Sequence, residues 1–183
     1  MRLSPTTLTG TYAIDPVHSR IGFIARAMVS KVQGSFNEFV GTGYFDAEDP
    51  SRSHLDLTIQ AHSIDTGNAK RDAHLRSNDF FAAEEYPEIR FVSTAVERID
   101  NWNHRVTGDV TIKGVTKPVT VNVELTGVGD DPFGNHRIGF KGKAVVNRKD
   151  WGVKWKAVLE AGGVLVGGRV TLDFEVSSIR TDS

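Results

Sequence analysis

The feature that most restricts the fold is a strict alternation of apolar and polar residues. In residues 119–125 the apolar positions are Val119, Val121, Val123 and Leu125, separated by Thr120, Asn122 and Glu124. The same period of two recurs in residues 55–59, 106–112 and 172–176. Successive side chains of a β-strand point to opposite faces of its sheet. Each segment therefore predicts a strand with one buried and one solvated face, which is typical of antiparallel sheets.

Weaker strand patterns and turn signals fill most of the remaining chain. The weaker strands are expected at residues 12–15, 19–27, 34–46, 88–98 and 137–147. Turns rich in Gly, Pro and Asp are expected at residues 113–118 and 129–135. The glycine-rich residues 162–168 are interpreted as the entry to the last strand rather than as a phosphate loop, because no Lys-Ser/Thr follows them. Together these signals predict about eight strands in one domain, residues 1–183, with a core at about residues 11–177.

Eight hairpin-connected strands leave two exposed edges unless the sheet closes on itself. Glycines within the strand patterns, such as Gly108, Gly139 and Gly142, are expected to mark the bends or bulges that closure needs. We therefore predict an all-β fold, a closed eight-stranded antiparallel barrel, with a β-sandwich as the alternative. Such a barrel is either filled by its own side chains or holds one small ligand. The inward faces are apolar, so an apolar ligand is expected.

Composition and motif spacing exclude several function classes. The chain has no cysteine, so disulfides, thiolate metal sites and cysteine nucleophiles are absent. The net charge is -1 with dispersed Lys and Arg, which argues against nucleic acid as a partner. No run of apolar residues is long enough to span a membrane, and residues 1–10 have no signal-peptide core, so a cytoplasmic protein is expected if Met1 is the natural start. The six histidines lack metal-ligand spacing, and neither a nucleophile elbow nor a paired-acid motif is present, so we expect no metal, no cofactor and no catalytic residues.

One segment, residues 66–81 (TGNAKRDAHLRSNDFF), departs from the strand pattern. Asn68 or Thr66 can cap a short helix near residues 68–77, in which Asp72 is placed to pair with Arg76. The helix has no wide apolar stripe, so we expect it on the surface, with Phe80 and Phe81 turned toward the interior. A plain crossover between strands and a lid over a cavity are both consistent with this pattern.

Eight sequence motifs, in order along the chain, resemble those of the YceI-like family. They are YAIDPVHS (12–19), SKVQGSF (30–36), SIDTGN (63–68), RDAHLRSNDFF (71–81), YPEIRF (86–91), VTGDVTI (106–112), GVTKPV (114–119) and NRKDWG (147–152). The resemblance implies an extended, lipocalin-like eight-stranded barrel with a channel for an isoprenoid lipid, and a homodimer. The absence of a signal peptide implies a cytoplasmic branch.

Two positions depart from the family pattern. Ala27 follows Arg26 where many relatives have a histidine, and Trp151 stands where many have phenylalanine. A bulkier aromatic wall at residue 151 is expected to shorten or reshape the channel.

The leading hypothesis is thus a non-enzymatic carrier or sequestering protein for a long isoprenoid lipid, such as a polyprenyl phosphate or an isoprenoid quinone. An enzyme that uses Asp65, Arg71, Asp72 and His74, and a fully packed structural barrel, are the alternatives. A polar head group is expected near Arg71, His74 and Arg148. The expected channel wall consists of Phe23, Phe36, Phe39, Leu57, Ile59, Phe80, Phe81, Phe91, Val110, Ile112, Val121, Val123, Phe140, Trp151, Leu172 and Phe174.

Overall fold

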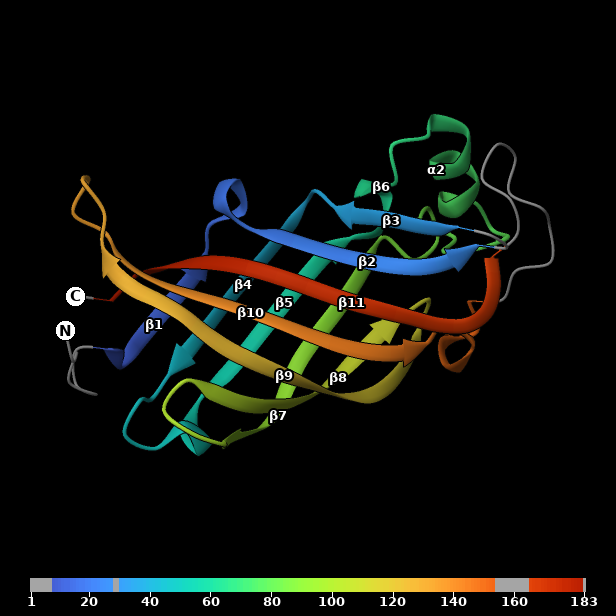
Figure 1. Cartoon of the computed structure of the whole chain (residues 1–183). Coiled ribbons are helices and arrows are strands. Elements are labelled where there is room, and N and C mark those ends of the chain that lie inside the picture. The colour runs from blue at the N-terminus through green and yellow to red at the C-terminus, as the bar shows by residue number, and fades with distance from the viewer. Residues whose placement is uncertain (1–7, 28–29, 154–164, 183) are drawn as a thin grey trace.

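A computed structural model describes residues 8–27, 30–153 and 165–182 (Figure 1). The strands are β1 (Gly10–Ile14), β2 (Arg20–Ala27), β3 (Lys31–Phe36), β4 (Phe39–Phe45), β5 (His54–Gln60), β6 (Ile64–Asp65), β7 (Glu88–Arg98), β8 (Asn103–Ile112), β9 (Val115–Asp130), β10 (His136–Asn147) and β11 (Leu165–Arg180). The helix α2 spans Ala69–Arg76. Short 3-10 helices occupy Pro16–His18, Pro50–Arg52, Ala61–Ser63 and Arg148–Trp151.

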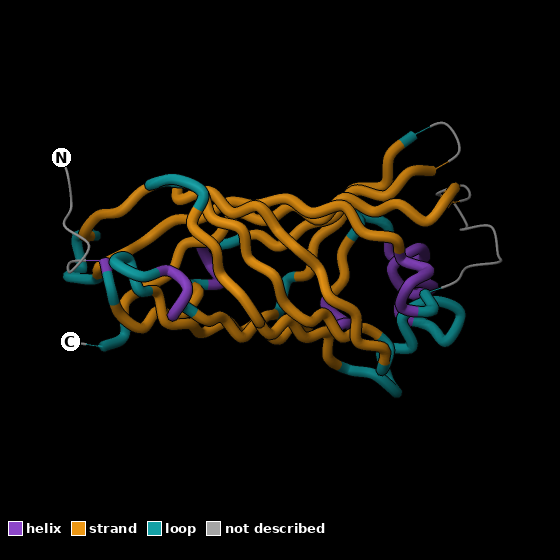
Figure 2. The backbone as a smooth tube through the Cα atoms, turned by 90° about the horizontal axis from the view of Figure 1, so that it is seen from below, coloured by secondary structure: helices purple, strands orange, loops and turns teal. Residues whose placement is uncertain are grey.

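Eight strands form a closed antiparallel ring, which confirms the predicted barrel over the sandwich. Around the ring the order is β1, β4, β5, β7, β8, β9, β10 and β11, and pairing of β11 with β1 closes it. Strands β2, β3 and β6 extend the sheet from β11. The barrel is elongated, with α2 at one end and the C-terminal end of β11 at the other (Figure 2). Closure removes the exposed edges of the ring strands.

The first three strands of the barrel are each interrupted, which explains why eleven segments make an eight-stranded wall. Both β1 and β2 run antiparallel to β11 at successive positions along it, separated by the 3-10 helix at Pro16. Likewise β4 continues β3, and β6 continues β5 after the turn at residues 61–63. The interruptions follow residues that favour breaks, such as Pro16, whose ring fixes φ and whose nitrogen carries no hydrogen.

The hairpin between β8 and β9 is tighter than the sequence predicts. Its turn consists of Lys113 and Gly114 alone, both with positive φ (52° and 76°). Two left-handed residues match the type I′ turns whose twist suits a two-residue hairpin. Residues 115–118, expected in the turn, belong to β9 and pair with β8 as far as Val115 opposite Ile112.

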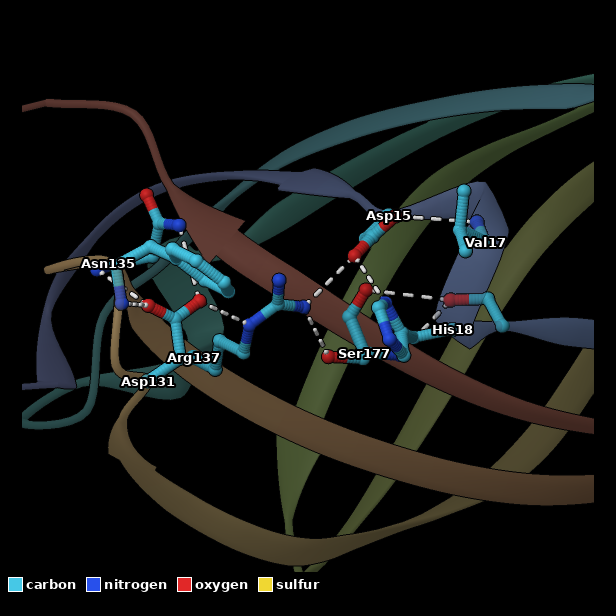
Figure 3. A network of polar contacts seen from close by, with 9 residues as sticks. Asp15, Val17, His18, Asp131, Asn135, Arg137 and Ser177 are labelled. Carbon is cyan, nitrogen blue, oxygen red and sulfur yellow. Dashed lines mark hydrogen bonds and ion pairs between the residues drawn. The ribbon is translucent and has the colours of Figure 1, made fainter.

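A network of charged residues links the segment between β1 and β2 to strands β10 and β11 (Figure 3). Arg137 donates through Nε to Asp131 (2.7 Å) and through Nη1 to Asp15 (2.9 Å) and to Ser177 (3.1 Å). These hydrogen bonds hold the pKa of both carboxyl groups below the usual range, because they favour the ionised form. Asp15 also accepts from the backbone N–H of Val17, so the network caps the 3-10 helix as well.

Candidate functional site

The interior of the barrel contains an elongated cavity of about 330 Å³. Every strand of the ring contributes side chains to its wall, as do β2, β3, β6 and α2. The wall is almost wholly apolar because the inward positions of the alternating strands are Val, Leu, Ile and Phe. The volume lies within the range of small-molecule sites, roughly 300–1,000 Å³.

Most of the side chains expected in the channel wall border this cavity. They are Phe23, Phe36, Leu57, Ile59, Phe80, Phe81, Phe91, Val110, Ile112, Val121, Val123, Phe140, Trp151, Leu172 and Phe174. The prediction for Phe39 is wrong in this respect: its side chain is buried in the apolar core but does not border the cavity. Strand alternation predicts the face to which a side chain points, but not whether its neighbours cover it.

Arg71 and His74, near which a polar head group is expected, have their polar groups engaged by neighbouring residues of the α2 segment. Arg71 donates to the hydroxyl and the carbonyl oxygen of Thr66 (2.8 and 2.9 Å), and His74 Nε2 lies 3.2 Å from a carboxylate oxygen of Asp79. Neither residue borders the cavity, and neither do Asp65 and Asp72. These four side chains instead make hydrogen bonds to residues next to α2. The cluster proposed for an enzyme therefore does not converge on the cavity.

The helix α2 begins where the sequence predicts, but its acidic residue has another role. Asn68 caps the helix by accepting from the backbone N–H of Arg71 (3.0 Å). Asp72 is buried and accepts from the N–H and the hydroxyl of Thr66, so the predicted Asp72–Arg76 ion pair is wrong. The helix is therefore tied to the chain that enters it from β6.

The aromatic pair that follows α2 borders the cavity next to β3. Phe80 and Phe81 contact each other edge to face, with ring centroids 4.9 Å apart, and Phe81 contacts Phe36 of β3. Leu75 of α2 is buried beside them. The β5–β7 ladder ends at Gln60 and Glu88, so α2 and the residues after it lie where the two strands no longer pair. The expectation that both phenylalanines turn inward is confirmed.

At the same end, the 3-10 helix Arg148–Trp151 adds two members of the wall. The indole Nε1 of buried Trp151 donates to the carbonyl oxygen of Val110 (2.9 Å), which fixes the ring against β8. Arg148 donates to the carbonyl oxygen of Val153 (2.8 Å), and burial lowers the pKa of its guanidinium. Of the three head-group residues predicted, Arg148 is the one that borders the cavity.

The spacing of the histidines does not single out His104, although this residue borders the cavity. It lies on β8 and is only 6% exposed, and burial lowers the pKa of its imidazole. Its ring contacts Phe45 at 5.7 Å. Strand alternation does place His104 on the inner face, because residue 104 has the same parity as Val106 and Val110, which also border the cavity.

Glycines opposite the cavity phenylalanines leave room for their rings. Phe23 of β2 pairs with Gly34 of β3, and Phe174 of β11 pairs with Gly142 of β10. A Cβ on Gly34 would lie 2.5 Å from the Phe23 ring, and one on Gly142 2.3 Å from the Phe174 ring. Glycine at these two positions is therefore explained by the close packing of aromatic rings along the cavity wall.

The described residues contain neither a metal-binding cluster nor a membrane-spanning helix. No cluster of three or more His, Asp or Glu side chains there is arranged to hold a metal ion. No helix in that part of the chain is long and apolar enough to cross a membrane.

The closed ring and its apolar interior define a lipocalin-like antiparallel barrel. The chain belongs to the YceI-like family, because the model of the YceI-like domain matches residues 12–178. It is 42% identical over 152 residues to a UPF0312 protein of Photorhabdus laumondii (81% of this chain, 79% of the relative). It is 40% identical over 152 residues to Protein YceI of Escherichia coli O157:H7, with the same coverage.

Solved structures agree on the fold. BcnA of Burkholderia cenocepacia superposes with a TM-score of 0.79 at 25% identity, covering 90% of this chain and 98% of that one. A polyisoprenoid binding domain from Saccharophagus degradans, implicated in plant cell wall breakdown, has a TM-score of 0.64 at 15% identity, covering 93% of this chain and 98% of that one. At this identity the second likeness concerns the fold alone.

Proposed function

We propose that the protein binds a long isoprenoid lipid in the barrel cavity, without catalysis, and carries or sequesters it. The observation that carries the proposal is the cavity wall, which is apolar along almost its whole length. Family membership and the description of the S. degradans domain as polyisoprenoid binding support the same ligand class.

Burial of the lipid chain supplies the affinity. Each Å² of apolar surface removed from water contributes about 25 cal/mol, and an isoprenoid chain has hydrogen-bonding groups only at its polar end. The wall therefore needs no polar partner along the chain, and Val, Leu, Ile and Phe suffice. Arg148 is our candidate for a charged or polar head group at the α2 end of the cavity.

A charge placed in the wall tests the proposal. Val121 of β9 is buried and borders the cavity, whereas the next residue, Asn122, is exposed. We expect Val121→Asp to abolish binding of a polyprenol and of an isoprenoid quinone, because an unpaired buried carboxylate is costly. Asn122→Asp adds the same charge to the same strand and should leave binding unchanged. Binding is measured by native mass spectrometry after incubation with each lipid, and circular dichroism checks the fold.

A second variant covers the case in which Val121→Asp does not fold. Val121→Phe narrows the cavity without adding charge, and we expect it to reduce lipid uptake while the barrel stays folded. Unchanged uptake in every folded Val121 variant would place the ligand elsewhere and contradict the proposal.

Two finer predictions accompany this function. The homodimer expected from the family resemblance is tested by light scattering of the purified protein. The cytoplasmic location is tested by fractionation of the source cells. The alternative enzyme hypothesis places its active site at Asp65, Arg71, Asp72 and His74. These residues do not border the cavity, so they do not support catalysis on a ligand bound there.

A further inference from the structure

The end of the cavity away from α2 contains a polar side chain in apolar surroundings. His104 stands six residues before Val110 on β8, so at about 3.3 Å per residue the two positions lie roughly 20 Å apart along the strand, and Val110 accepts the hydrogen bond from Trp151. Its neighbours include Phe45, itself in edge-to-face contact with Phe140, and both phenylalanines border the cavity. The two ends of the cavity are thus chemically different.

Within the described residues, neither ring nitrogen of His104 makes a hydrogen bond to another protein group, although the side chain is 6% exposed. Among the described residues, Asp173 Oδ1 is the one side-chain oxygen or nitrogen that is fully buried without a partner, so the ring nitrogens of His104 keep contact with accessible space, and His104 borders the cavity. His104 is therefore a polar group available to a molecule inside the cavity.

Nearby charged side chains are engaged outside the cavity. Arg98, opposite His104 on β7, is exposed and hydrogen-bonds Asn101. The carboxylate of Asp100 accepts from the backbone N–H groups of Trp102 and Asn103 in the same turn. Neither Arg98 nor Asp100 borders the cavity. His104 is not the only polar residue at this end, because Tyr12, His54 and the buried Ser178 also border the cavity there, but it is the buried imidazole of the group.

The protonation state of that imidazole limits the ligand group that it can accept. Burial, with a smaller effect of Arg98, lowers the pKa of His104, so the ring is neutral at pH 7. A neutral imidazole offers one N–H donor and one acceptor nitrogen. It can pair with a carbonyl or hydroxyl oxygen, but it does not offset the burial of a phosphate charge.

We infer that His104 forms a hydrogen-bonding subsite for a neutral oxygen of the bound isoprenoid, a quinone carbonyl or an alcohol hydroxyl. The inference rests on the proposed function and deepens it, because it favours neutral quinones and alcohols over phosphorylated lipids at this end. The isoprenoid chain then extends from His104 along the apolar wall toward Phe80 and Phe81.

Three probes and four variants test the subsite. The probes are geranylgeraniol, its parent hydrocarbon and geranylgeranyl phosphate, and the readout is the dissociation constant of each. A neutral hydrogen bond contributes about 0.5–1.5 kcal/mol, so His104→Leu should weaken binding of geranylgeraniol by about two- to tenfold and leave the hydrocarbon unchanged. His104→Gln, which keeps a donor, should recover part of the loss. His136→Leu removes an exposed histidine that pairs with Asp130 and should change nothing.

The outcomes separate the subsite from the function. If wild-type protein binds none of the three probes, the proposed function fails. If all bind but His104→Leu weakens the alcohol and the hydrocarbon equally, the subsite is wrong while the function stands. Loss of the preference for alcohol over hydrocarbon in Arg148→Met, and not in His104→Leu, would place the polar group at the α2 end and overturn the inference.

Discussion

At the scale of single residues, Arg137 shows how one side chain couples distant parts of the chain. It joins Asp131, in the turn between β9 and β10, to Asp15, which precedes the break between β1 and β2 (Figure 3). Both carboxyl groups have pKa values below those of an unfolded chain, chiefly because of their hydrogen bonds to Arg137. Their stabilising contribution is therefore present above the unfolded pKa of about 3.9 and is lost as pH falls through the folded values.

This linkage predicts a pH-dependent effect of Arg137→Gln. The substitution removes the main cause of both lowered pKa values, so the variant should be less stable than wild type at pH 7, and the difference should shrink below about pH 4. Urea unfolding at several pH values measures it. Arg105→Gln, which breaks an exposed pair with Glu97, should have little effect at any pH. A stability difference that is the same at pH 7 and pH 2.5 would show that Arg137 acts through packing alone.

At the scale of elements, α2 and the two phenylalanines after it pack against the barrel where β5 and β7 no longer pair. The buried carboxylate of Asp72 holds the helix to Thr66. Leu75 and Phe80 then anchor the segment in the core. The segment is thus a structural part of the cavity wall, built from polar contacts on its outer side and apolar contacts on its inner side.

The contact between Asp72 and Thr66 gives a prediction for the helix as a unit. Asp72→Ala leaves the Thr66 N–H without its partner, at a cost of about 1–3 kcal/mol. We expect faster amide hydrogen exchange in residues 66–81 with little change in β8 and β9. Lys70→Ala, an exposed change on the same helix, is the matched control and should leave exchange as in wild type. Uniformly faster exchange across the barrel would contradict a local role.

The elements also show which parts of the site a sequence can reveal. Alternation places Val121, Val123 and Phe174 on the inner face, because strand parity is a local property of the chain. The Asn68 cap is local for the same reason. Contacts between distant residues are not readable in this way: Arg137 and Asp15 are 122 residues apart, and the burial of Asp72 depends on how α2 folds back on Thr66. Strand parity predicts that His104 points inward, whereas the spacing between histidines gives no indication of it.

At the scale of the whole molecule, closure of the ring and the apolar cavity are two results of one pattern. The alternation that buries one face of each strand also lines the interior once β1 pairs with β11. Phenylalanines packed over Gly34 and Gly142 shape the wall without filling the cavity. The fold therefore provides the space for a long apolar ligand, and the two ends differ in the polar side chains they offer.

Native mass spectrometry of the protein, purified under mild conditions and then incubated with polyprenols and isoprenoid quinones, tests the central claim most directly. The account predicts an adduct with the mass of an isoprenoid lipid, retained in Asn122→Asp and absent in Val121→Asp. A wild-type protein that stays free of lipid in every incubation would contradict it and favour a barrel with a purely structural role.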